Sequence, residues 1–123
     1  MSILKKILLS ILFVLVNCKI VKTYTDNCAP LSVDNIQKIT ILIKKNATKS
    51  INIKERIEIK EFIISLNNSE VNGLWKGAKW DEITLYYRDQ SKKIFFTNGK
   101  VFGQGSSGIF YNLSDKYKHY WKE

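Results

Sequence analysis

The dipeptide Asn98-Gly99 stands between the apolar runs KIFFT and KVFG, and it constrains the fold more than any other feature of the sequence. Asn-Gly flanked by apolar runs is typical of a tight β-hairpin, because both residues tolerate the positive φ that such turns require. Strands joined in this way are antiparallel. The second half of the chain is therefore predicted to form an antiparallel sheet.

Period-two alternation predicts the remaining strands. Residues 39–43 and 83–87 alternate between two faces and are rich in β-branched or aromatic residues. Shorter segments at 50–53 and 109–113 follow or precede polar turns and predict two more strands. The glycine-interrupted residues 71–80 are predicted to form a loop.

A helical period occurs once in the middle of the chain, where apolar residues recur at i, i+3, i+4 and i+7: Ile59, Phe62, Ile63 and Leu66. A second, short helix is predicted to begin at Ser114, a residue type favoured at N-caps. Together these elements predict an α+β domain: a small antiparallel sheet of about five strands, with one amphipathic helix packed on a face and a short C-terminal helix.

The first residues have the three-part pattern of an export signal. Lys5 and Lys6 precede an apolar run, Ile7–Val16, after which polar residues return at once. That run of about ten residues is half the roughly 20 that a membrane-spanning helix needs, and it suits a signal peptide. The alternative is a buried N-terminal helix of a protein that is not exported. We expect export.

Leu15-Val16-Asn17-Cys18 resembles the lipobox of bacterial lipoprotein precursors, in which a leucine stands three residues before an invariant cysteine. Asn17 occupies the position where that family usually has Gly, Ala or Ser. The resemblance implies that residues 1–17 are removed and that Cys18 becomes the lipidated first residue, which anchors the chain to a membrane. A disulfide between Cys18 and Cys28 is the competing use of that cysteine in an oxidising compartment.

Polar residues and the only proline, Pro30, predict a linker over residues 18–32 and a single domain over residues 33–123. An ordered strand around residues 20–24 is the alternative for the linker. Export places the protein in the cell envelope or periplasm.

The formal net charge is +9, and a chain beginning at Cys18 keeps about +7 because it loses only Lys5 and Lys6. Such a lysine-rich surface favours acidic partners: anionic lipid headgroups, an acidic polysaccharide or an acidic protein. Export argues against nucleic acid as a partner.

Catalytic and metal-binding signals are weak. The sole histidine, His119, has no evident nucleophile or carboxylate partner in the sequence, and no CxxC spacing occurs. Asp81 and Glu82 are adjacent on a predicted strand, so they should point to opposite faces and act as surface charges. No catalytic residue, metal or cofactor is therefore expected.

Aromatic residues interleaved with lysines predict a ligand-binding surface, for which Trp75, Trp80 and Tyr86 are the candidate residues. The alternative is that these side chains fill a core. The predicted function is non-catalytic binding of a protein or glycan by an exported, lipid-anchored envelope protein. An inhibitor or immunity protein against an exported enzyme, and a hydrolase with an unrecognised site, are the alternatives.

Overall fold

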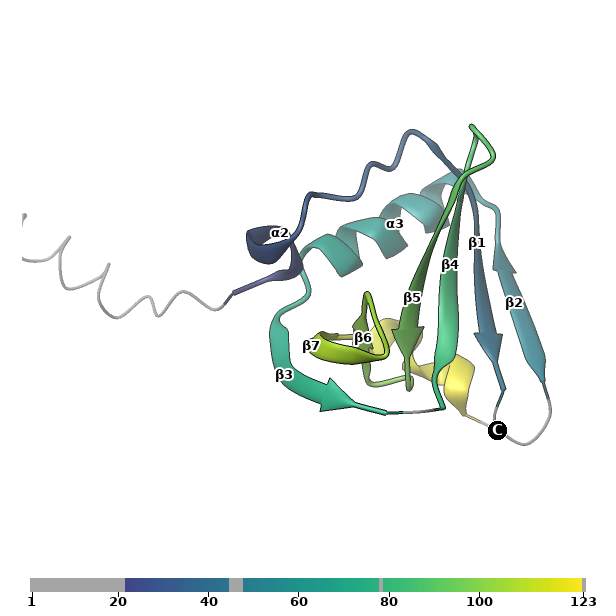
Figure 1. Cartoon of the computed structure of the whole chain (residues 1–123). Coiled ribbons are helices and arrows are strands. Elements are labelled where there is room, and N and C mark those ends of the chain that lie inside the picture. The colour runs from purple at the N-terminus through teal and green to yellow at the C-terminus, as the bar shows by residue number, and fades with distance from the viewer. Residues whose placement is uncertain (1–21, 45–47, 78, 123) are drawn as a thin grey trace, which may run out of the picture.

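A computed structural model describes residues 22–44, 48–77 and 79–122, and its elements form one sheet with helices on a single face (Figure 1). In chain order the elements are α2 (Tyr24–Asn27), β1 (Ile36–Ile43), β2 (Lys49–Ile53), α3 (Arg56–Asn67), β3 (Val71–Lys76), β4 (Asp81–Tyr87), β5 (Lys92–Thr97), β6 (Val101–Gly103), β7 (Ser107–Asn112) and the 3₁₀ helix η1 (Asp115–Trp121). The strand order is β2-β1-β4-β5-β6-β7-β3, and every neighbouring pair is antiparallel.

The predicted fold class is wrong. The protein is mostly β, with a sheet of seven strands where an α+β fold with about five was expected. The segment predicted as a loop contains the edge strand β3, which pairs with β7 across a register shift between Val71 and Gly73. Gly73 has φ +154, a conformation that glycine adopts without strain, so here the glycine marks a bulge inside a strand.

The apolar stripe of α3 is confirmed residue by residue. Its four predicted positions are all fully buried: Ile59, Phe62, Ile63 and Leu66. They pack over one face of the sheet, on which the register aligns Ile41 of β1 with Ile83 of β4, and Ile83 with Phe95 of β5. This face, called the inner face below, carries the main core.

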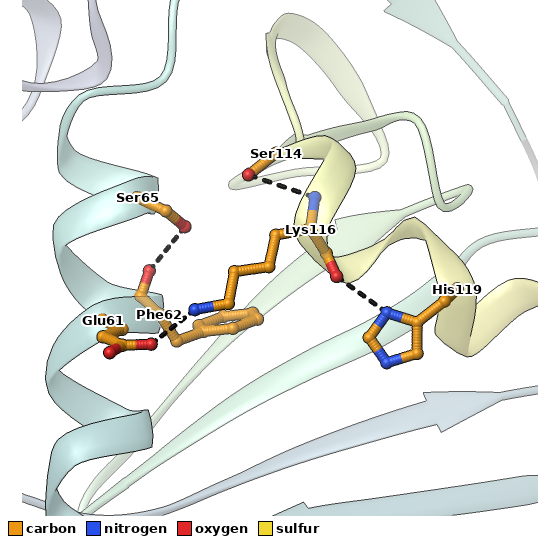
Figure 2. A network of polar contacts seen from close by, with 6 residues as sticks. All are labelled: Glu61, Phe62, Ser65, Ser114, Lys116 and His119. Carbon is orange, nitrogen blue, oxygen red and sulfur yellow. Dashed lines mark hydrogen bonds and ion pairs between the residues drawn. The ribbon is translucent and has the colours of Figure 1, made fainter.

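The C-terminal η1 lies on the same inner face. Tyr117 of η1 packs edge-on against Phe62 of α3, with ring centroids 4.6 Å apart. Figure 2 shows a second link between the two helices, an ion pair from Lys116 to Glu61. The hydrogen bond in this pair raises the pKa of Lys116. At the start of η1, the Ser114 hydroxyl accepts from the Lys116 backbone N–H at 3.4 Å (Figure 2).

The segment predicted as a linker is packed where the structure describes it. Tyr24 is fully buried against Phe95, Phe102 and Tyr111, and Leu31 also joins the core. Backbone hydrogen bonds join this segment to the chain around β3, from Tyr24 N–H to Ser69 at 2.9 Å and from Val71 N–H to Lys22 at 2.8 Å. Residues 22–32 therefore belong to the domain.

The predicted signal peptide (residues 1–17) and Cys18 lie outside the described residues, as do residues 20 and 21 of the alternative N-terminal strand. Within the described part of the chain, no helix is both long enough and apolar enough to cross a membrane.

Removing residues 22–32 should destabilise the domain. Comparing a chain that begins at Lys22 with one that begins at Val33, we expect the shorter chain to lose at least about 4 kcal/mol of unfolding free energy, because two large apolar side chains leave the core. Urea unfolding followed by circular dichroism measures the difference. Equal stability of the two chains would contradict the packing of Tyr24 and Leu31.

Candidate functional site

The three candidate aromatic residues lie in two separate places. Trp80 is only 9% exposed and stacks on Phe110 of β7, with centroids 4.7 Å apart. Trp75 of β3 is half-buried, 6.3 Å from Trp80 by ring centroid. These two indoles belong to a small apolar cluster on the outer face of the sheet, together with Phe96, Val101 and Phe110.

Tyr86 lies near the far end of β4. It is five residues beyond Asp81, or about 17 Å along a strand, and the Lys38 ammonium lies 4.6 Å from its ring centroid. The structure therefore brings Trp75 and Trp80 together, and it leaves Tyr86 in a different, smaller pocket with Lys38 and Lys54.

A cavity of about 760 Å³ opens at the end of the sheet, between Trp80 and Trp121. Four segments far apart in the sequence form it: the end of β1, the residues leading into β4, the β5–β6 turn and the end of η1. Five of the ten lining residues are lysines: Lys44, Lys79, Lys100, Lys118 and Lys122. The other five are Trp80, Asp81, Asn98, Gly99 and Trp121.

Asp81 holds two of these segments against β4. Its Oδ1 accepts from the Lys44 backbone N–H at 2.8 Å, and its Oδ2 accepts from Trp121 Nε1 at 2.8 Å. The prediction of Asp81 as a mere surface charge therefore needs correction, because both carboxylate oxygens bond to neighbouring segments. Its neighbour Glu82 pairs with the Lys44 ammonium at 2.6 Å, on the other face of β4.

Trp121 packs on the Asn98-Gly99 turn. The predicted hairpin is confirmed, since β5 and β6 pair on either side of this turn. Asn98 Oδ1 accepts from the backbone N–H groups of Lys100 and Val101, at 2.8 and 3.0 Å. Gly99 has φ +88, and a Cβ at this position would lie 2.6 Å from Cγ of Trp121. The glycine therefore permits both the turn and the close approach of the indole.

The lysines around the cavity differ in their partners. Lys44 pairs with Glu82, and Lys118 pairs with Asp115 at 2.6 Å, a hydrogen bond that lowers the pKa of Asp115. Among the residues that the structure describes, no carboxylate lies within ion-pair distance of the other three lining lysines: Lys79, Lys100 and Lys122. Among the described residues of the cavity wall, positive charge therefore predominates over the one carboxylate, Asp81.

His119 and the possible metal ligands can be placed within the described part of the chain. His119 lies outside the cavity lining, and its Nδ1 is 2.7 Å from the backbone oxygen of Lys116 (Figure 2). Within residues 22–44, 48–77 and 79–122, no group of three or more His, Cys, Asp or Glu side chains is placed to hold a metal ion.

The comparisons with known proteins give no match: no protein family, no curated protein sequence and no solved structure resembles the chain significantly.

Replacing Gly99 by alanine should disturb the cavity wall at one point. We expect Gly99→Ala to cost about 2 kcal/mol of unfolding free energy, because alanine is strained at this φ and its Cβ displaces Trp121. Urea unfolding and tryptophan fluorescence measure the two effects. Gly105→Ala is the matched control, since a Cβ there would make only an ordinary contact, 3.5 Å from the Ser107 carbonyl. Similar values for both variants would contradict the role of Gly99.

Proposed function

We propose that this chain is an exported protein of the cell envelope, anchored through a lipid on Cys18, whose domain binds an acidic polysaccharide without catalysis. The observation that carries the proposal is the cavity with five lysines between two indoles. Its volume of about 760 Å³ is within the range of small-molecule sites and suits a unit of a polymer. The lysines attract anionic groups, and the partly exposed Trp121 offers an apolar ring against which a sugar ring can pack.

The side chains of the cavity support binding over hydrolysis. A hydrolase commonly uses an activated nucleophile beside a base, or two carboxyl groups across the scissile bond. The lining residues that the structure describes include one carboxylate, Asp81, and both of its oxygens already accept hydrogen bonds.

The concave shape also favours a polysaccharide over an acidic protein. A stable protein partner commonly needs about 1,200–2,000 Å² of buried surface, whereas a cavity takes a protruding unit of a chain. The net charge of about +7 that a chain beginning at Cys18 keeps adds long-range attraction to any acidic polymer.

Polymer binding tests the cavity. With the full chain in detergent, we expect polygalacturonate and dextran sulfate to bind and neutral dextran not to bind. Changing the three cavity lysines without a carboxylate partner (Lys79, Lys100 and Lys122) to glutamine should weaken binding at least about tenfold, because charge-assisted hydrogen bonds are lost. Isothermal titration calorimetry measures the affinities.

A control with the same change in net charge separates the cavity from general attraction. Lys22, Lys60 and Lys92 are exposed and do not line the cavity, so their triple glutamine variant should keep most of the affinity. Equal losses in the two triple variants would contradict a site in the cavity.

Lipid attachment has its own test. In a bacterial host, the membrane fraction should contain wild-type chain whose intact mass includes acyl groups, and Cys18→Ser should lack that mass and leave the membrane. Cys28→Ser is the matched control and should stay acylated. A wild-type chain that is soluble and carries no acyl mass would contradict the anchor, as would an intact Cys18–Cys28 disulfide.

A further inference from the structure

We infer that the cavity recognises a tetrahedral ester group on a sugar ring, a phosphate or sulfate monoester, in preference to a sugar carboxylate. The inference rests on the proposed function and names the chemical unit of the acidic polysaccharide that enters the site. Three features carry it: the supply of hydrogen-bond donors, the number of lysines without a carboxylate partner, and the fixed indoles.

The side chains of the cavity offer donors and few acceptors. The acceptor atoms are largely in use, since Asp81 accepts from Lys44 and Trp121, and Asn98 Oδ1 accepts two backbone N–H groups. Most of the polar groups that remain are donors, namely the ammonium groups and the Asn98 amide N–H, beside the residual acceptor capacity of Asp81. A neutral sugar brings hydroxyl donors that need acceptors of their own, whereas an ionised ester only accepts. The lining therefore matches a ligand group made of acceptor oxygens.

The number of lysines without a carboxylate partner favours an ester over a carboxylate. Among the residues that the structure describes, Lys79, Lys100 and Lys122 line the cavity without one. A phosphate or sulfate monoester presents three terminal oxygens, one for each ammonium, and a phosphate monoester carries about −1.5 to −2 charges at neutral pH. A carboxylate presents two oxygens and one charge, and its geometry is best matched by the planar fork of arginine. Lysine is the only cation among the described lining residues.

Neither indole offers a free N–H group to the cavity, and the ring of Trp80 is more covered than that of Trp121. Trp121 Nε1 donates to Asp81 at 2.8 Å, and Trp80 Nε1 donates to the Ser106 carbonyl at 2.9 Å. Gly99 packs against the partly buried Trp121, whereas Trp80 stacks on Phe110 and also lies against Gly77, where a Cβ would be 2.8 Å from its ring. Both rings are therefore fixed before a ligand arrives, which lowers the ordering cost of binding a sugar ring.

Four small probes test the inference by calorimetry on the full chain in detergent: glucose 6-phosphate, glucose 6-sulfate, glucuronate and inorganic phosphate. We expect at least one of the two esters to bind about tenfold or more tightly than glucuronate, because a third charged contact is made. The stronger ester identifies whether the source is a phosphorylated or a sulfated glycan. Inorganic phosphate should bind more weakly than the better ester, since it has no ring to pack on Trp121.

Variants test separately the roles of the cavity lysines and of the Trp121 ring. The triple glutamine variant at Lys79, Lys100 and Lys122 should lose the preference for esters, and the exposed triple variant at Lys22, Lys60 and Lys92 should keep it. Trp121→Leu should reduce the ester affinity to that of inorganic phosphate while phosphate itself still binds. Retained phosphate binding shows that this variant is folded.

Different results overturn different claims. Glucuronate that binds as tightly as both esters overturns the inference, and polygalacturonate binding that depends on the cavity lysines would leave the proposed function in place. Inorganic phosphate that binds as tightly as the better ester also overturns the inference, because the ring then contributes nothing. If neither the small probes nor the acidic polymers bind, the inference and the proposed function both fail.

Discussion

The carboxylate of Asp81 is the contact on which the candidate site depends. It lies at the start of β4 and accepts one hydrogen bond from the backbone at the end of β1 and one from the indole of Trp121. Through these two bonds a central strand of the sheet fixes both the lysine-bearing end of β1 and the C-terminal helix η1. The same bonds engage both oxygens of the carboxylate that lines the cavity, so the geometry of the site and its shortage of free acceptor oxygens have one origin.

A cavity lined by five lysines carries like charges that repel one another, and the structure offsets this repulsion with packing more than with ion pairs. The pairs of Lys44 with Glu82 and of Lys118 with Asp115 involve partly or largely exposed side chains, and such pairs contribute little to stability. Packing contacts are the stronger supports: the partly buried Trp121 packs on Gly99, and the buried Tyr117 packs on Phe62. The packing can thus stabilise a cavity whose lining includes lysines without a carboxylate partner.

Sequence patterns predicted correctly those elements that are determined by residues close together in the chain. The stripe of α3, the strands around Ile41 and Leu85, and the Asn98-Gly99 hairpin follow from periodicity and turn chemistry within a few residues. The alternation pattern did not predict the strand β3, because Gly73 interrupts the alternation there. In the structure this glycine lies at a bulge within the strand. The packed N-terminal segment was missed because the burial of Tyr24 depends on three aromatic rings at least 71 positions away in the sequence. The cavity was missed for the same reason, since four distant segments form it.

The positions of the cavity and of the N-terminal segment also bear on the proposed anchor. Figure 1 places α2, where the described chain begins, on one side of the domain, and the C-terminal end of η1 on the other. Trp121 and Lys122 at that end belong to the cavity lining. An anchor that precedes α2 therefore joins the domain away from the cavity. A domain held from that side can turn its lysines toward a polymer outside the membrane, whereas a cavity beside the anchor would face the lipid headgroups.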